Sequence, residues 1–196
     1  MTSTISTTTD LTREVNGLKL PVPGTFALDR SHTEVGFIAR HLMVSKVRGR
    51  FTDFDGAVVV AENPDDSSVE VTIKAASIDT HDDSRDNHVR GSDFLNVEEY
   101  PTIEFRSTKV ELGGAKSWKV SGDLTIRGIT RPTVLDVEFE GVIVDPWGNQ
   151  RLGFAASGEI DRNDFGVSFN AALETGGFVV SPKVRLEIDA EAVRQA

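Results

Sequence analysis

The chain has 196 residues, a length typical of one β-barrel or β-sandwich domain, and 38% of them are hydrophobic, enough for a sizeable core. Its formal net charge of −10 argues against a nucleic-acid partner, because a negative field repels the phosphate backbone. The lack of cysteine excludes disulfides, a thiolate nucleophile and cysteine-ligated metal sites, and no apolar run reaches the roughly 18 residues of a membrane-spanning segment, so we expect a protein that does not span a membrane.

Residues 1–23 are polar, rich in Thr and Ser, and lack the apolar core of a secretory signal. We expect a flexible tail, followed from Leu11 to Pro23 by a lead-in that packs lightly on the domain. Residues 24–196 then form the domain itself. With Met1 as the natural start, this predicts a cytoplasmic protein; a chain whose leader had been removed would instead be periplasmic or secreted.

From Gly24 onward apolar and polar residues alternate, which is typical of strands with one buried and one exposed face. Short turn-forming separators such as Asn63–Asp66, Asp145–Asn149 and Thr175–Gly177 predict antiparallel hairpins. The pattern predicts an all-β fold of about eight or nine antiparallel strands, a sandwich or a barrel, and the long alternating runs favour a barrel. The alternating runs lie at 26–29, 35–39, 51–61, 69–75, 103–105, 118–126, 135–139, 152–160 and 184–190.

The charged segment from Thr80 to Pro101 interrupts this alternation. Asp82 and Asp83 suit the first turn of a short helix, and Gly91 suits its end. Ser92 suits the cap of a second short helix through Leu95. With a further short helix expected at 163–169, we predict helices close to an opening of the barrel.

Two groups of residues have the composition of a reactive site, and we expect neither to be one. His81 and His88 flank three aspartates, but seven residues span two helical turns, about 10 Å, too far for one ion. Asp29, Ser31 and His32 have the residue types of a hydrolytic triad. Neighbours on a strand point to opposite faces, so we expect no hydrogen bond between Ser31 and His32. The sequence therefore predicts no metal site, no cofactor and no catalytic residues.

The 11 phenylalanines are the most informative remaining feature, and several of them fall on the alternating faces. They fit a core filled by side chains, or a barrel whose interior stays open for an apolar ligand. Composition alone does not separate these two alternatives.

A series of short blocks, in a consistent order, resembles the YceI-like family, also called polyisoprenoid-binding proteins. The resemblance covers residues 25–191. The matching blocks are 26–32, 35–37, 40–42, 47–51, 54–56, 77–80, 88–89, 92–95, 100–108, 122–130, 160–166 and 174–177.

The resemblance implies an all-β fold, an extended antiparallel β-barrel of about eight strands that is lipocalin-like, with short helices near its opening. It also implies a long apolar tunnel for a polyisoprenoid, an isoprenoid quinone or a fatty acid derivative, and no catalysis. Many members of the family carry a signal peptide, whereas this chain begins with a polar tail.

Alternation and resemblance together select the residues that we expect to bind the ligand. Three polar residues, His41, Arg90 and Asp93, are expected to orient its head group at the mouth; the alternative is that they fix the helices to the barrel. The predicted tunnel wall consists of Val35, Phe37, Phe51, Phe54, Val71, Ile73, Phe94, Phe105, Leu124, Ile126, Phe154 and Phe165.

The sequence thus favours a non-enzymatic protein that carries or sequesters a long-chain isoprenoid or lipid ligand. An enzyme acting on a hydrophobic molecule through His41 or His88, and a filled-core interaction module, are the alternatives. A homodimer is compatible with the sequence, although no apolar stripe identifies an interface.

Overall fold

The computed structural model describes residues 11–42, 44–114, 116–170 and 179–196, so the turn predicted at Thr175–Gly177 lies outside the described residues. Its strands are β1 (Thr12–Val15), β2 (Leu18–Pro21), β3 (Gly24–Leu28), β4 (Glu34–His41), β5 (Ser45–Phe51), β6 (Phe54–Val60), β7 (Ser68–Lys74), β8 (Ile78–Asp79), β9 (Thr102–Leu112), β10 (Ser117–Ile126), β11 (Ile129–Val144), β12 (Gln150–Asp161) and β13 (Val180–Arg194). The helical segments are the α-helix α1 (Asp83–Arg90) and the 3-10 turns η1 (Pro64–Asp66), η2 (Ala75–Ser77) and η3 (Arg162–Phe165).

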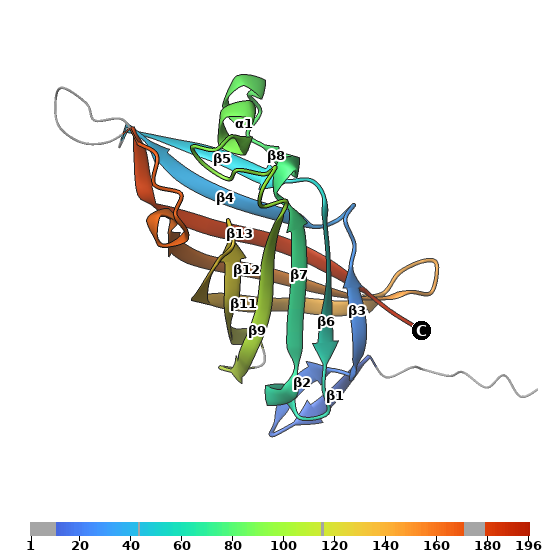
Figure 1. The fold of residues 1–196 in the computed structure, drawn as a ribbon. Helices are drawn as coiled ribbons and strands as arrows, with labels where there is room; N and C mark the ends of the chain where they lie inside the picture. The colour runs from blue at the N-terminus through green and yellow to red at the C-terminus, as the bar shows by residue number, and fades with distance from the viewer. Residues whose placement is uncertain (1–10, 43, 115, 171–178) are drawn as a thin grey trace, which may run out of the picture.

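Eight strands close into an antiparallel barrel, as the alternation predicted. They follow one another in the order β3, β6, β7, β9, β10, β11, β12 and β13, and β13 also pairs with β3 to complete the ring. Strands β4, β5 and β8 extend the sheet from the same edge of β13, and α1 lies next to this extension at the top of Figure 1. The predicted fold class is therefore confirmed.

Irregularities in the strands decide which side chains face inward. The run expected at 51–61 is two strands, because β5 ends at Phe51 and β6 begins at Phe54. The register between β9 and β10 shifts between Ser107 and Lys109. Thr108 therefore has no register partner on β10 and forms a bulge. Phe105 and Val110 are therefore both buried, although they have opposite parity in the sequence.

A cluster of buried side chains packs between strands β3, β6, β11, β12 and β13. Phe26, Leu152 and Ala192, from β3, β12 and β13, are fully buried in it. A larger cluster lines the rest of the interior and includes Leu20 of the β1–β2 hairpin, which is only 1% exposed. The expectation of a lightly packed lead-in is therefore wrong, since burial of Leu20 fixes this hairpin to the domain.

The helical insert forms as one helix rather than two. Asp82 caps α1 by accepting a hydrogen bond from the backbone N–H of Arg85 at 2.9 Å, and Gly91 ends it. The second helix expected from Ser92 is absent, because the backbone N–H of Leu95 turns back to the carbonyl of Val89 at 2.9 Å. The helix expected at 163–169 is the shorter turn η3.

Candidate functional site

A cavity of about 500 Å³ lies inside the barrel. Its wall is built mostly from the inward faces of the strands, because alternation places every second side chain there. The apolar lining residues of the strands include Val35, Phe37 and Ala39 of β4, Val69, Val71 and Ile73 of β7, Ile103, Phe105 and Val110 of β9, Trp118, Val120, Leu124 and Ile126 of β10, Leu135 and Val137 of β11, Phe154, Ala156 and Ile160 of β12, and Val180, Val184, Leu186, Ile188 and Ala190 of β13.

The structure places most of the predicted site residues on this wall. Those that line the cavity are Val35, Phe37, His41, Phe51, Val71, Ile73, Phe94, Phe105, Leu124, Ile126, Phe154 and Phe165. The remaining three lie elsewhere, among them Phe54, which is buried in the larger core cluster. The Arg90 side chain donates to the carbonyls of Ala76 and Ile78, both at 2.8 Å, and Asp93 is hydrogen-bonded to His88.

Three aromatic rings meet at the end of the cavity next to α1. The His88 ring lies edge-on to Phe94 and to Phe169, with centroids 5.1 and 5.2 Å apart. Phe94 and Phe169 are 5.3 Å apart, and all three residues line the cavity. The guanidinium of Arg127 holds this region by donating to the carbonyls of Phe94 and Gly166, at 2.9 and 3.1 Å. We call this end of the cavity, defined by His88, Phe94 and Phe169, the mouth.

Arg162 fixes the backbone on the other side of the mouth. Its guanidinium donates to the carbonyls of Ser181, Phe169 and Val180 at 3.0, 2.9 and 3.2 Å, and also to that of Val167. The residue is 6% exposed, and burial lowers the pKa of its guanidinium below its ordinary value, although the negative charge of Asp161 acts in the opposite direction. Arg162 therefore joins the start of β13 to the segment that carries Phe169.

Several lining residues were missed by the sequence reasoning. Trp118 shares the parity of Leu124 and Ile126, so the alternation on β10 was a usable signal. Thr133 is an inward-facing polar residue on β11 that alternation also marks. Arg85 and Phe169 reach the cavity through the folding of α1 and of the segment after η3, which no local pattern describes.

The group that resembled a hydrolytic triad lies in the turn between β3 and β4. The expectation that Ser31 and His32 do not hydrogen-bond is wrong, because they occupy a turn rather than a strand, and Ser31 Oγ lies 3.3 Å from His32 Nδ1. The same nitrogen lies 3.0 Å from Asp29 Oδ2. A proton relay needs the two ring nitrogens to face different partners, so this arrangement is not a triad.

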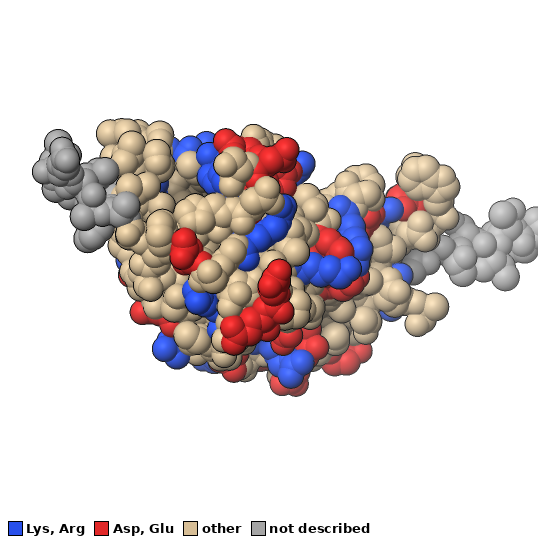
Figure 2. Space-filling model, turned by 45° about the horizontal axis from the view of Figure 1, so that its top comes forward, with Lys and Arg blue, Asp and Glu red and all other residues tan. Residues whose placement is uncertain are grey.

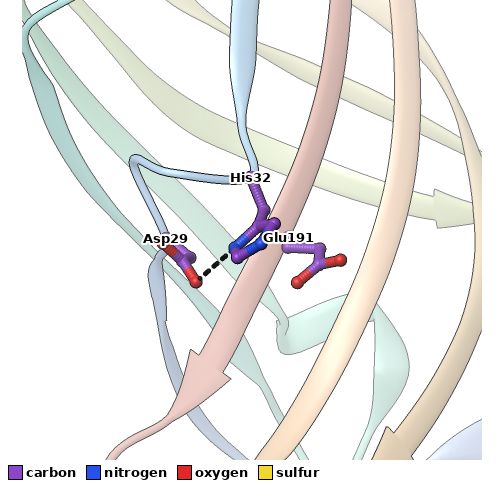
Figure 3. A group of neighbouring side chains, drawn as sticks. All are labelled: Asp29, His32 and Glu191. Carbon is purple, nitrogen blue, oxygen red and sulfur yellow. Dashed lines mark hydrogen bonds and ion pairs between the residues drawn. The ribbon is translucent and has the colours of Figure 1, made fainter. Parts of the chain in front are cut away.

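The same turn brings Asp29 and His32 close to Glu191 of β13, and the ligand atoms of the three residues lie within 4.8 Å of one another (Figure 3). Arg151 already supplies a cation there, because its Nη1 donates to Asp29 at 2.6 Å and to Glu191 at 3.0 Å. Hydrogen bonds from Ser31, Arg151 and His32 hold the pKa of Asp29 well below its ordinary value. We therefore assign the group to an ion-pair network that joins β3, β12 and β13.

The exterior differs from the lining. Figure 2 turns the end that carries α1 toward the viewer and shows acidic and basic side chains interspersed among uncharged ones. Within the described ranges, no helix has the length and apolar character needed to cross a bilayer.

Comparison with known protein families gives one match over most of the chain. A family model described as "YceI-like domain" matches residues 26–192. A UPF0312 protein of Photorhabdus laumondii is 42% identical over 178 residues, which cover 90% of this chain and 86% of the relative. A UPF0312 protein of Staphylococcus aureus is 43% identical over 169 residues, 85% of this chain and 95% of the relative.

Solved structures of similar proteins agree with this fold. The YCEI protein of Campylobacter jejuni has a TM-score of 0.70 and 31% identity, with 80% of this chain and 90% of that chain covered. BcnA of Burkholderia cenocepacia has a TM-score of 0.74 at 22% identity, covering 84% and 98% of the two chains. A polyisoprenoid binding domain from Saccharophagus degradans has a TM-score of 0.61 at 17% identity, covering 87% and 98%. At such low identity the last two show the fold alone.

Proposed function

This chain belongs to the YceI-like family, and from that premise we propose that it binds a long-chain amphiphile inside its barrel and carries or sequesters it without catalysis. The chemical class is a polyisoprenoid, an isoprenoid quinone or a fatty acid derivative. One observation carries the proposal: the barrel interior contains an apolar cavity of about 500 Å³ instead of a filled core. A polyisoprenoid binding domain from Saccharophagus degradans has the same fold, so a barrel of this kind can accommodate a ligand of this class.

The size and chemistry of the cavity suit this ligand. Its volume lies within the roughly 300–1,000 Å³ typical of small-molecule sites. Each methylene that leaves water for an apolar wall gains about 0.8 kcal/mol, so a ten-carbon segment gains about 8 kcal/mol before the cost of association. A tail of this kind needs few polar contacts for affinity.

The side chains near the cavity support binding more than catalysis. His88 is hydrogen-bonded to Asp93 at 3.1 Å, and its ring contacts two phenylalanines, which is a positioning role. His41 lies at the end of β4, opposite Val180 of β13. Ser45 lies opposite His41 on β5, but its hydroxyl donates to the backbone carbonyl of His41, at 3.4 Å, rather than to the imidazole ring.

Native mass spectrometry of the freshly purified protein, followed by organic extraction, tests the proposal. We expect a discrete adduct of one lipid per chain, or uptake of an added long-chain isoprenoid. A clean mass without adduct that persists after incubation with such lipids would contradict the proposal.

Two neighbouring alanines on β12 give a matched pair of variants. Ala156 lines the cavity, whereas Ala155 does not. Ala156→Phe fills the tunnel and should abolish uptake, while Ala155→Phe should retain it. Circular dichroism checks that both variants fold, and Ala156→Leu gives a milder obstruction if the larger side chain is not tolerated.

A further inference from the structure

The charged residues of the tunnel lining all have one sign. They are Arg40, Arg85 and Arg162, accompanied by His41 and His88, and within the described residues no aspartate or glutamate lines the cavity. The whole chain has the opposite bias, with 31 acidic residues against 21 Lys and Arg. The lack of carboxylates among the described lining residues therefore does not follow from the overall composition of the chain.

Most of these groups lie around the mouth, where a chain of contacts connects them. The His88 ring contacts Phe169, and the carbonyl of Phe169 accepts a hydrogen bond from Arg162. Arg162 also donates to the carbonyl of Val180, which is the register partner of His41. Arg85 precedes His88 by three residues on α1, so both lie on the same face of the helix.

The Arg85 guanidinium is oriented by Thr80 and forms no direct ion pair among the described residues. Its Nε and Nη2 donate to the hydroxyl and the carbonyl of Thr80, both at 2.7 Å. The Asp86 carboxylate contacts Thr80 and not the guanidinium, because it accepts from the backbone N–H and the hydroxyl of Thr80. Among the described residues, Arg85 forms no ion pair, and its Nη1 remains available for an acceptor at the mouth.

Arg162 adds a buried positive charge close by. It is satisfied by four backbone carbonyls and forms no ion pair within the part of the chain that the structure describes. A buried charge without a counter-ion is costly, and an anion at the mouth would compensate it. On the insert, Asp86 accepts from Thr80 and Asp93 is hydrogen-bonded to His88, and neither forms an ion pair with Arg162.

From this arrangement we infer that the bound amphiphile has an anionic head group, a carboxylate or a phosphate ester, held at the mouth by Arg85 and His88 with its tail in the tunnel. The inference rests on the proposed function and narrows its ligand class, since a neutral quinone or alcohol makes no use of the cationic rim. Charge-assisted hydrogen bonds from a guanidinium are the usual means of recognising both kinds of anion.

Calorimetric titration of the full-length protein with pairs of amphiphiles that share a tail tests this. The pairs are farnesyl phosphate with farnesol, and palmitate with hexadecanol; acetate and inorganic phosphate test head groups without a tail. We expect each anion to bind at least about ten-fold tighter than its alcohol, and the tail-free anions to bind negligibly. Equal affinity of an anion and its alcohol overturns the head-group inference and leaves the proposed function intact. Tight binding of free phosphate has the same meaning. Failure of every amphiphile to bind overturns both the inference and the proposed function.

Variants assign the preference to Arg85. Arg85→Gln should lower the affinity for farnesyl phosphate about ten-fold and leave farnesol unchanged, and Arg85→Lys should restore part of the loss. Lys109→Gln removes the same charge from an exposed residue outside the cavity and should change neither affinity. If Arg85→Gln and Lys109→Gln weaken the anion equally, the effect belongs to the overall charge and the assignment is wrong.

Discussion

The ring of Phe37 on β4 lies directly against Gly49, its register partner on β5. A Cβ atom at Gly49 would lie 2.7 Å from Phe37 Cε1 and 2.8 Å from Thr80 Cγ2, closer than real side chains approach. The glycine thus lets the phenylalanine lie flat along the wall rather than across the cavity. Phe105 lies against Gly122 of β10 in the same way.

Gly49→Ala should therefore reduce the capacity of the tunnel. The added methyl displaces the Phe37 ring toward the interior, and we expect weaker lipid uptake together with a loss of about 1–3 kcal/mol in the free energy of unfolding. Native mass spectrometry and urea denaturation measure the two effects. Gly114→Ala is the control, because nothing lies within 4 Å of a Cβ atom there. Unchanged uptake by Gly49→Ala would show that the ring position does not set the capacity.

Thr133→Val should stabilise the protein. Thr133 is 6% exposed, faces the cavity from β11, and its hydroxyl has no hydrogen-bond partner among the described residues. Replacing a cavity-facing hydroxyl that has no protein partner by a methyl group should raise the free energy of unfolding of the lipid-free protein by up to about 1 kcal/mol. Urea denaturation after delipidation measures this change. A loss of stability would contradict the prediction, because it would mean that the Thr133 hydroxyl forms a hydrogen bond inside the cavity.

Trp118 should report ligand binding by its fluorescence. It lines the cavity, is 6% exposed, and its indole N–H has no partner among the described residues. The chain has one other tryptophan, Trp147, which is 81% exposed. In Trp147→Phe, added lipid should change the emission until one equivalent is bound. A change that persists in Trp118→Phe but is lost in Trp147→Phe would place the lipid outside the barrel.

Asp29→Asn should destabilise the protein at neutral pH but not in strong acid. Hydrogen bonds from Ser31, Arg151 and His32 lower the pKa of Asp29 below its ordinary value of 3.8, and the side chain is only 16% exposed. A depressed carboxylate pKa contributes stability that is complete above the unfolded-state pKa and is lost as the pH falls through the folded-state value.

The wild-type protein should therefore exceed Asp29→Asn by about 2 kcal/mol in the free energy of unfolding at neutral pH, and the difference should shrink as the pH falls below 3.8. Urea denaturation over a pH series measures it. Asp55→Asn serves as the control, because its side chain is 79% exposed and its ion pair with Arg30 should contribute little. A constant difference across the series would mean that the charge of Asp29 is not the cause.

Alternation alone was sufficient for the barrel and for most of its wall, because a strand places every second side chain on one face. It failed where backbone irregularities change the facing. Thr108 is bulged, so Val110 joins Phe105 inside, and no local signal marks that bulge. The helical insert was harder to predict from the sequence. Asp82 and Gly91 indicated α1, but the approach of Arg85 and Phe169 to the cavity depends on long-range packing.

The filled cluster around Phe26, Leu152 and Ala192 has a consequence for exchange of the proposed ligand. Val58 belongs to this cluster and Phe154 packs against it, and both residues line the cavity, so the cluster bounds the cavity on that side. A ligand bound as we propose would have to leave by another side, because passage through the cluster would require its close-packed side chains to separate.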